Sequence, residues 1–503
     1  MASETSPARL ADADDGWWTR RRWIALLAGT TLLHAVLAAV LPLSGDEAYY
    51  WDCSRHLDWS YHDQPPLVIW AMVPFRALLG ENGLAVRAPA LLASLVQGLC
   101  FPPLARRLGG GLREAGRAFL LLQLTPLWFF GSFYASTDVA MMACYVAATW
   151  AAVAVAQGER RGWWGFGLAA GLGFVSKFPI VLVLAVLAPL LLRRQVRAQL
   201  RTPTPWLAAL LAALLTAPVW IYAGQHAFDN IAFQSGRVPT RSGVTLKHLG
   251  SFVAANLALV TPFVGLAMAH AALLCLKRRD AGWSVLRFAA GAPLAFFGLL
   301  SLRGSMSAHW GAPGLVLGAL FLAFELDGVR RWLTRAGAVL GGAAIAAALA
   351  LVLVPEPFIE LESSVRGFPD DPSRAELRDL VGNDELVAGT RARLRPGELV
   401  ASDSYSTVHV LAFLTAGELE TRLAYLHGSH GLASLYWHAP GDLLGRDMLF
   451  VTEDDRVVAR LPELFAEVEE LPPLTVELDG KPVRRVRFAR CRELRVAEGV
   501  FTR

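Results

Sequence analysis

The chain has 503 residues, of which 54% are hydrophobic and only 18% are charged, and its mean hydropathy is +0.41. Because an ordinary soluble domain is about one-quarter charged, this composition argues against a cytosolic enzyme and predicts a membrane protein with soluble mass attached. Residues 1–354 carry a net charge of +12 and residues 355–503 a net charge of −8. The overall charge of +4 therefore averages two unlike parts.

Cysteine spacing and the placement of the basic residues bear on three further classes of protein: zinc-binding, disulfide-rich and nucleic-acid-binding proteins. The five cysteines show no CxxC or Cys/His spacing, so neither a structural zinc site nor a dense disulfide framework is indicated. Cys53 and Cys491 could pair if both are extracytoplasmic. The basic residues stand in short loops between apolar runs, which is typical of membrane topology. We therefore expect no nucleic-acid partner.

The first apolar run covers residues 23–43 and follows three arginines at 20–22. Its length of about 20 residues is enough to cross a bilayer core. No small-residue cleavage site is evident after it, so we expect a retained helix with a cytoplasmic N-terminal tail over residues 1–22.

Further apolar runs predict about eleven crossings in all between residues 23 and 354. After the first they cover 84–105, 118–135, 138–157, 162–176, 178–192, 206–224, 250–276, 284–301, 309–326 and 336–354. Alternate loops are basic, as the positive-inside rule requires of cytoplasmic loops. These five loops contain Arg106, Arg107, Arg113 and Arg117; Arg160 and Arg161; Arg193, Arg194, Arg197 and Arg201; Lys277, Arg278 and Arg279; and Arg330, Arg331 and Arg335.

The first outer loop, residues 44–83, concentrates acids and aromatic residues. Carboxylates beside a bilayer are costly unless they are solvated, paired or functional. Aromatic faces next to carboxylates suit a sugar, so we take as candidate substrate-binding residues Tyr49, Tyr50, Trp59, Tyr61, His62 and Asp63. Two plainer interpretations stay open: residues 44–47 form a capping box at a helix start, and the aromatics belong to the membrane interface. The apolar stretch 65–79 is broken by Pro74 and Arg76 and reads as a helix lying in the interface.

Two charged residues interrupt apolar sequence at the next outer turns. Asp138 starts an otherwise apolar helix, where it could be an acid of the site or only an N-terminal cap. Lys177 divides an apolar stretch of about 30 residues; it could bind a lipid phosphate or snorkel from a helix end.

Later outer loops add further polar residues among Gly, Ser and Pro. Arg237, Arg241 and Lys247 are candidates for binding a phosphate, because Arg presents a bidentate fork and Lys a point charge. Gln234 and His309 are further candidates for substrate binding. A solvated loop near lipid headgroups would show a similar mixture of residues.

An odd number of crossings places residues 355–503 outside as a small α/β domain. Strands are expected at 398–403, 447–452 and 483–488, and helices at 406–416 and 457–466. The predicted fold class is thus a polytopic α-helical membrane protein, with its catalytic part at 23–354 and an extracytoplasmic α/β domain at 355–503.

Motifs for binding nucleotides are absent where they would carry meaning, namely GxxxxGK[ST] and GxGxxG. HExxH and GxSxG motifs are absent as well. An energy-rich donor on the outer side would therefore have to arrive in the lipid.

Six segments in order resemble a bacterial member of the GT-C superfamily of lipid-linked glycosyltransferases. This branch contains dolichyl-phosphate-mannose protein mannosyltransferases and undecaprenyl-phosphate aminoarabinose transferases. The segments are GDEAYYW at 45–51, YHDQPPL at 61–67, STD at 136–138, SKFP at 176–179, FQSG at 233–236 and HWGAP at 309–313.

The resemblance implies that Asp46 is the catalytic acid of the first loop, that Glu47 helps to orient it, and that Asp138 is the second acid. Aminoarabinose transferases have an acid-Lys pair before the PPL, whereas this chain has Asp63 and Gln64. This departure puts the aminoarabinose activity in doubt.

The expected function is inverting transfer of a sugar from a polyprenyl phosphate to a lipid, glycan or protein acceptor, on the outer face of the bacterial cytoplasmic membrane. Such a displacement needs one base for the acceptor hydroxyl, which we assign to Asp46, and cations for the leaving phosphate. If the acceptor is itself a phosphate, Asp46 would mainly position it. The sequence leaves a divalent metal open. Alternatives are a transporter or flippase of lipid-linked sugar precursors, and a sensor or scaffold anchored by the helices.

Overall fold

The computed structural model describes residues 17–237, 243–367, 376–427 and 430–503, and the chain divides into two compact units. The helical unit comprises residues 1–39, 58–71 and 87–346. The α/β unit comprises residues 40–57, 72–86 and 347–503. The first outer loop is thus shared between the two, and each unit is described by itself.

The helices of the helical unit include four that run on into the α/β unit, namely α1, α3, α4 and α17. In chain order they are α1 (Arg20–Val40), α3 (Leu67–Leu79), α4 (Gly83–Arg107), α5 (Leu112–Gln123), α6 (Pro126–Gly131), α7 (Thr137–Ala156), α8 (Gly162–Phe174), η2 (Phe178–Val186), α9 (Leu187–Leu191), α10 (Arg194–Gln199), α11 (Pro203–Gln225), α12 (Asp229–Gly236), α13 (Leu246–Val260), α14 (Pro262–Cys275), α15 (Ala281–Ser301), η3 (Ala308–Gly311), α16 (Ala312–Phe324) and α17 (Gly328–Leu353).

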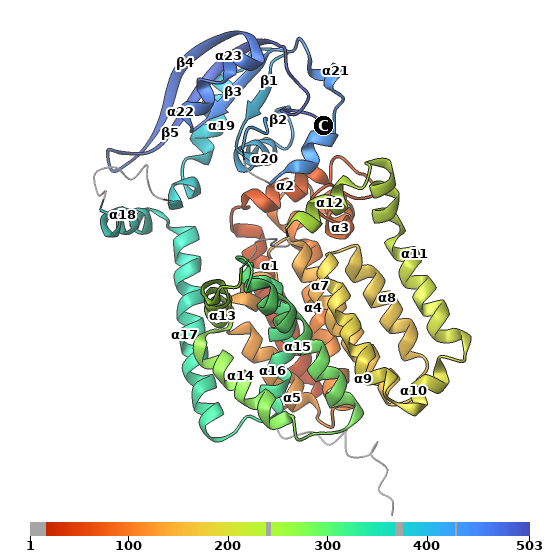
Figure 1. Cartoon of the computed structure of the whole chain (residues 1–503). Helices are drawn as coiled ribbons and strands as arrows, with labels where there is room; N and C mark the ends of the chain where they lie inside the picture. The colour runs from red at the N-terminus through yellow and green to blue at the C-terminus, as the bar shows by residue number, and fades with distance from the viewer. Residues whose placement is uncertain (1–16, 238–242, 368–375, 428–429) are drawn as a thin grey trace, which may run out of the picture. The chain divides into compact units, whose positions relative to one another are not determined.

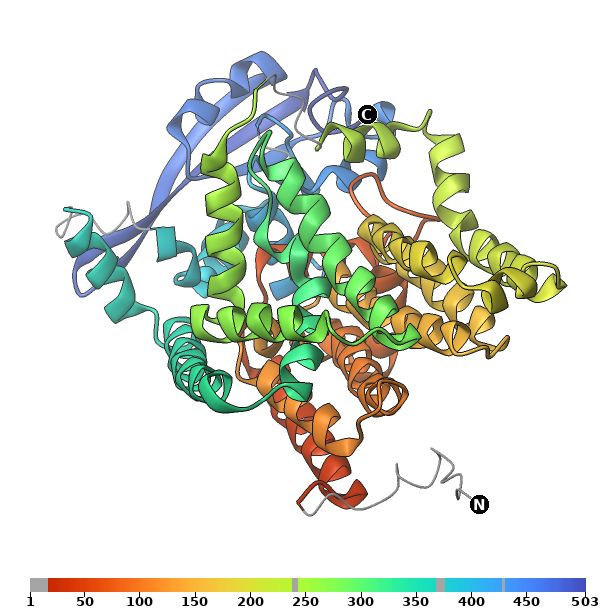
Figure 2. The ribbon, with the colours of Figure 1, turned by 60° about the horizontal axis from the view of Figure 1, so that its bottom comes forward.

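Six of the helices in the described sequence are long and apolar enough to cross a membrane: α1, α4, α7, α11, α15 and α17. The number becomes seven if the bent pair α13 and α14 counts as one span. The other expected crossings are shorter or interrupted, and the interruptions fall at prolines. Residues 118–135 form two helices because Pro126 starts α6, and residues 178–192 begin as the 3₁₀ helix η2 behind Pro179. The expected crossing at 250–276 bends by 102° (Figure 2), where Thr261 has a φ of 68° before Pro262.

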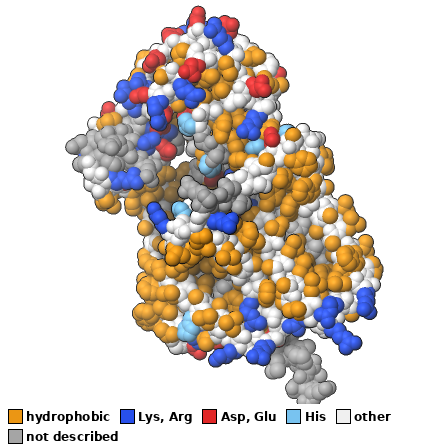
Figure 3. Space-filling view, viewed as in Figure 1, with side chains coloured by type: hydrophobic (Ala, Val, Ile, Leu, Met, Phe, Trp, Pro, Cys, Tyr) orange, Lys and Arg blue, Asp and Glu red, His pale blue; other side chains and the backbone are white. Residues whose placement is uncertain are grey.

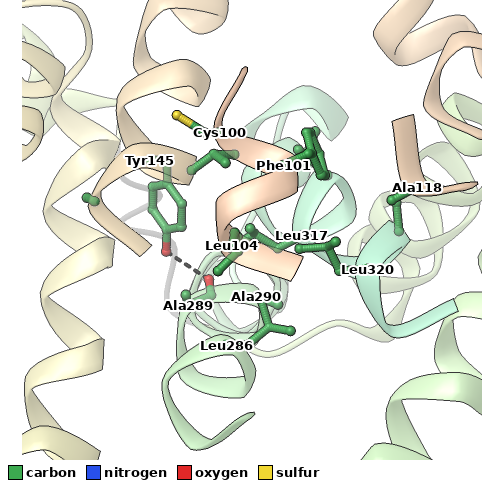
Figure 4. Close-up of a cluster of buried hydrophobic side chains, with 14 of the residues drawn as sticks. Cys100, Phe101, Leu104, Ala118, Tyr145, Leu286, Ala289, Ala290, Leu317 and Leu320 are labelled. Atoms are coloured by element: carbon green, nitrogen blue, oxygen red, sulfur yellow. Dashed lines mark hydrogen bonds between the residues drawn. The ribbon is translucent and has the colours of Figure 1, made fainter. Parts of the chain in front are cut away.

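The core of the helical unit is a cluster of buried hydrophobic side chains where α4, α7, α15 and α16 meet (Figure 4). Phe101, Leu104 and Leu317 are completely buried there. The hydroxyl of Tyr145 donates to the carbonyl oxygen of Ala289 over 2.8 Å, so the polar group in this cluster is satisfied. Hydrophobic side chains also cover much of the face of this unit that Figure 3 shows.

Hydrogen bonds connect the basic loops to one another. Arg107 is ion-paired with Glu159 at 2.7 Å, and Trp283 Nε1 donates to the carbonyl of Leu108. Arg278 pairs with Glu325 at 2.8 Å, and Gln195 donates to the carbonyl of Ala156. All five basic loops therefore lie at one end of the helical unit, which agrees with the alternation expected from the positive-inside rule.

The loops predicted to lie on the other side are joined in the same way. Leu67 N donates to the carbonyl of Val175 over 2.8 Å, and Ser176 Oγ donates to the carbonyl of Thr137 over 2.7 Å. Thr245 N donates to the carbonyl of Leu302. The candidate residues Asp138 and Lys177 stand in this second set of loops.

The α/β unit is built on a five-stranded mixed sheet in the order β2-β1-β3-β5-β4 (Figure 1). β1 pairs in parallel with β2 and β3, whereas β5 is antiparallel to β3 and β4. Its elements are α2 (Gly45–Cys53), α18 (Glu356–Val365), η5 (Glu376–Leu380), α19 (Asn383–Arg393), β1 (Leu399–Ser402), α20 (Tyr405–Leu414), β2 (Thr421–Leu423), η6 (Leu432–Tyr436), α21 (Pro440–Leu443), β3 (Met448–Thr452), α22 (Asp455–Val458), α23 (Leu461–Leu464), β4 (Phe465–Leu478) and β5 (Lys481–Leu494).

Three strands and one helix of this unit match the sequence prediction: β1, β3, part of β5, and α20. The helix expected at 457–466 is wrong. Two short helices occupy that stretch, and β4 begins at Phe465. Pro462 starts α23, and a Glu–apolar alternation then continues as a strand paired with β5. No disulfide joins Cys53 and Cys491, which are both buried.

Residues 44–57 of the first outer loop belong to the α/β unit, in which α2 lies against α20. This long-range pairing, about 360 residues apart in the chain, was not expected from the sequence.

Candidate functional site

Asp138 and Lys177 form an ion pair at the end of the helical unit opposite the basic loops. Lys177 Nζ donates to Asp138 Oδ2 over 2.6 Å, and the two side chains are only 19% and 18% exposed. His309 Nε2 lies 3.9 Å from the same oxygen. The other carboxylate oxygen, Oδ1, is buried and makes no hydrogen bond within the described structure. This half-satisfied carboxylate can accept one more donor from a ligand.

Local chain geometry fixes this pair. Ser136 is the N-cap residue of α7, so Asp138 falls in the first turn and its side chain is directed to Lys177 instead of capping the helix. Lys177 has an extended backbone as the N-cap residue of η2, two residues before Pro179. The hydrogen bond from Ser176 to Thr137 joins the two turns. Capping alone and snorkelling alone therefore do not describe these two side chains.

Asp63, Gln234 and His62 come together in the same unit. Gln234 Nε2 donates to the carbonyl oxygen of Asp63 over 2.6 Å. The centroid of the buried His62 ring lies 5.0 Å from that of the Phe233 ring. The guanidinium of Arg237 lies 4.7 Å from the centroid of the Phe233 ring. Segments 61–67 and 233–236, each singled out in the sequence, are thus neighbours.

The remaining outer-loop candidates of the helical unit differ in exposure. Tyr61 is buried, whereas Trp59 is 49% exposed. Lys247 is an exposed residue near the start of α13, where its backbone N–H donates to Thr245. Arg241 lies outside the described residues.

Helix α2 starts with a complete capping box, as the plainer interpretation of residues 44–47 predicted. Ser44 Oγ accepts from the backbone N–H of Glu47, and Glu47 Oε2 accepts from the backbone N–H of Ser44 over 3.1 Å. Glu47 is completely buried. Its carboxylate thus holds the first turn, which carries Asp46.

Asp46 and Tyr49 both contact the C-terminal part of the α/β unit. The hydroxyl of Tyr405 donates to Asp46 Oδ1 over 3.0 Å. The hydroxyl of Tyr49 accepts from the backbone N–H of Ala433 over 3.1 Å. Tyr49 is only 3% exposed, and the half-buried Tyr50 lies beside it at 5.8 Å between ring centroids.

Asp52, one turn further along α2, forms a buried pair with His409. His409 Nδ1 lies 2.9 Å from Asp52 Oδ2, with side-chain exposures of 0% and 4%. Burial alone would raise the pKa of Asp52, but His409, with Arg55 and His56, lowers it below its usual range. Burial lowers the pKa of His56 to about 4, and its ring stacks on Trp437 at 4.1 Å.

Sequence reasoning missed three residues that hold α2: Tyr405, His409 and Trp437. The signal available was Tyr405, directly before the predicted helix at 406–416, and His409 within that helix. Nothing local to these residues points to a partner near residue 50.

No group of three or more His, Cys, Asp or Glu side chains that could hold a metal ion occurs within residues 17–237, 243–367, 376–427 and 430–503.

Part of the chain is similar to known sugar transferases. Residues 63–222, which include Asp138 and Lys177, match the family described as dolichyl-phosphate-mannose-protein mannosyltransferase. The chain is 25% identical over 293 residues to lipid A galacturonosyltransferase RgtD of Rhizobium johnstonii; the match covers 56% of this chain and 60% of that protein. It is 32% identical over 223 residues to the undecaprenyl phosphate-alpha-4-amino-4-deoxy-L-arabinose arabinosyl transferase of Edwardsiella ictaluri; the match covers 39% of this chain and 40% of that protein. The chain thus aligns with about half the length of these curated relatives.

Solved structures extend the similarity over nearly the whole chain. The apo crystal structure of ArnT from Cupriavidus metallidurans superposes with a TM-score of 0.61 at 18% identity, covering 93% of this chain and 98% of ArnT. The crystal structure of the same protein bound to undecaprenyl phosphate gives the same TM-score and identity, covering 94% and 98%. The chain therefore has an ArnT-like fold, and the similarity to lipid-linked glycosyltransferases expected from the sequence agrees with these relatives.

Proposed function

We propose that this multi-pass GT-C relative is a glycosyltransferase that moves a sugar from a polyprenyl phosphate to an acceptor on the outer face of the bacterial cytoplasmic membrane. The observation that carries the proposal is the Asp138–Lys177 pair. It lies inside the segment that matches a lipid-phosphate-sugar transferase family, and at the end of the helices opposite five basic loops. Because basic loops favour the cytoplasm, this end faces outward.

The donor phosphate is bound by cations. The Lys177 ammonium has three N–H donors, one of which goes to Asp138, so Asp138 orients the ammonium and the others can meet a phosphate. We propose Arg237, Arg241 and Lys247 as further phosphate contacts. That ArnT has been crystallised with undecaprenyl phosphate supports this donor class.

The chemical step is a displacement at the anomeric carbon with inversion. The acceptor hydroxyl oxygen forms a bond to that carbon as the bond to the phosphate oxygen breaks, and the polyprenyl phosphate leaves with the bonding electrons. Asp46 takes the proton of the acceptor hydroxyl as general base, while Glu47 holds the helix turn that carries it. The cations stabilise the charge that develops on the phosphate.

The sugar is bound by polar and aromatic side chains of the outer loops. For this role we propose Tyr49, Tyr50, Trp59, Tyr61, His62, Asp63, Gln234 and His309. Because one relative is named as a lipid A galacturonosyltransferase, we propose lipid A as the acceptor. Another relative is named for an undecaprenyl phosphate donor that carries aminoarabinose, so galacturonate and aminoarabinose are the sugars to test.

The test is sugar transfer by the purified protein in vesicles. The vesicles contain lipid A and undecaprenyl phosphate carrying either galacturonate or aminoarabinose, and glycosylated lipid A is measured by mass spectrometry. We expect transfer of one sugar by the unmodified protein and a loss of about 10³-fold in Asp46→Asn, as for removal of a general base. Asp58→Asn is the matched control and should keep the unmodified activity. Asp58 is an exposed acid of the same loop, and its carboxylate accepts from the backbone N–H of Trp59.

Two outcomes would overturn the proposal. One is transfer that is undiminished in Asp46→Asn. The other is movement of the donor across the vesicle bilayer without transfer, equally in the unmodified protein and in Asp46→Asn, which would identify a flippase.

The proposed orientation has its own test in cells. Glu418 of the α/β unit and Arg160 of a basic loop are both exposed, so each can be replaced by cysteine. We expect a membrane-impermeant maleimide to label Glu418→Cys and to leave Arg160→Cys unlabelled until the cells are opened. The reverse pattern would place the Asp138–Lys177 pair on the cytoplasmic side.

A further inference from the structure

Tyr405 is the first residue of α20 and directs its hydroxyl at Asp46. The hydroxyl donates to Asp46 Oδ1 over 3.0 Å, and the ring stacks on His430 with centroids 5.4 Å apart. Ser404 Oγ caps the helix by accepting from the backbone N–H of Thr407 over 3.2 Å. The hydrogen bond to Asp46 and the stacking on His430 therefore fix the direction of the phenol.

The two helices that carry Asp46 and Tyr405 are held together along one face of α2. Gly45 lies against Ser406: a Cβ at residue 45 would overlap the Ser406 side chain and lie 3.1 Å from its Cα. Further along the same face, Tyr49 accepts from Ala433 N and Asp52 pairs with His409. Positions 45, 49 and 52 have the spacing of one helical face, so α2 has one fixed register against the C-terminal part of the unit.

The phenol can orient a carboxylate without neutralising it. Burial raises the pKa of Tyr405, and the negative charge of Asp46 raises it further, so the hydroxyl keeps its proton and remains a donor. A neutral donor leaves the negative charge on the carboxylate, whereas a cation would compensate it. A base needs both a fixed direction and an available charge.

We propose that Tyr405 is a positioning residue for Asp46, so that the C-terminal part of the chain orients the base of the reaction. This inference rests on the proposed function, because it requires that Asp46 be the base. Removal of the hydroxyl takes away one contact that fixes the Asp46 carboxylate, and fewer bound acceptors then meet it in line with the anomeric carbon. The rate of the chemical step falls, while binding of the lipid donor is unaffected.

The test compares Tyr405→Phe with Ser404→Ala in the vesicle assay. Tyr405→Phe keeps the ring and its stacking on His430 but removes the hydroxyl, and we expect kcat to fall about tenfold, as for loss of a hydrogen bond to a charged group. The KM for the lipid donor should stay within about twofold. Ser404→Ala removes the cap of the same helix and lowers its stability without touching Asp46, so kcat should stay at the unmodified value.

A third variant, Asp46→Asn, separates this inference from the proposed function. If Asp46→Asn is inactive and Tyr405→Phe has the unmodified kcat, the positioning role is wrong and the function stands. An equal loss of kcat in Tyr405→Phe and Ser404→Ala would also contradict the role, because it would trace the loss to a weakened helix. If Asp46→Asn keeps full activity, the base assignment fails and the inference fails with it.

Discussion

Asp138 in the helical unit and Asp46 in the α/β unit look alike in the sequence, because each follows a predicted outer turn and falls in the first turn of a helix. Their surroundings differ. Asp138 is paired at 2.6 Å with the ammonium of Lys177, and His309 lies 3.9 Å away. Asp46 accepts a hydrogen bond from the neutral phenol of Tyr405. One carboxylate therefore pairs with a cation, and the other receives a hydrogen bond from a phenol that adds no positive charge.

This difference suggests a division of labour between two acids that sequence alone treats as equivalent. An ion-paired carboxylate is suited to orienting a cation toward a phosphate. A carboxylate with a neutral donor is suited to accepting a proton. Experiments that disturb each carboxylate separately can break or sharpen this contrast.

After Asp46→Asn, the largest effect on transfer is expected from Lys177→Met, which removes the proposed phosphate contact and the ion pair of Asp138. We expect sugar transfer to fall about 100-fold, because a preorganised contact with the charge that develops on the phosphate is lost. Adding Asp138→Asn should cause little further loss, since the two residues act as a pair. Lys277→Met, at an exposed lysine of a basic loop, is the control and should be fully active. Additive losses in the double variant would show that the two residues act independently.

The next largest effect concerns stability in the α/β unit. His409→Leu leaves the Asp52 carboxylate, which is 4% exposed, without its buried partner. We expect a loss of about 3 kcal/mol, seen as a lower denaturation midpoint in detergent. His427→Leu breaks a comparable contact with Asp403 in which the His side chain is 56% exposed, and it should cost below about 1 kcal/mol. Similar losses in both variants would argue against a buried anchor for α2.

A smaller effect is expected from pH. The pKa of His56 is lowered by burial to about 4 in the folded protein, from about 6.5 in an unfolded chain. The stability that comes from neutral His56 is therefore complete above about pH 6.5 and declines as the pH falls toward 4. The Asp52 pKa is also lowered, so its contribution persists until the pH falls below about 3.9.

The measurement is the denaturation midpoint of the protein as a function of pH. His56→Gln should flatten its decline between about pH 6.5 and 4, because the titrating imidazole is gone. An unchanged decline in His56→Gln would assign the acid sensitivity to other groups.

Much of the helical unit could be predicted from local sequence. Apolar runs of about 20 residues produced α1, α4, α7, α11, α15 and α17, and the alternation of arginine-rich loops indicated which loops share an end. The breaks in other runs depended on individual prolines such as Pro126. Hydropathy averaged over a window does not register one residue of this kind.

The candidate site was predictable only in part, for a physical reason. Asp138 and Lys177 interrupt apolar sequence, where an unpaired charge is costly, so each could be found and their pairing is a natural outcome. The contact of Asp46 with Tyr405 joins residues 359 positions apart. It depends on how α20 packs on α2, and no local periodicity specifies that packing.

The most direct test of the division of labour is rescue by azide, an anionic nucleophile that needs no base. In the vesicle assay with added azide, we predict that Asp46→Ala forms a glycosyl azide with inverted configuration while transfer to lipid A stays lost. Asp138→Ala should form none, because the cation at the phosphate is no longer oriented. Formation of the azide product by Asp138→Ala and not by Asp46→Ala would contradict the assignment of Asp46 as the base.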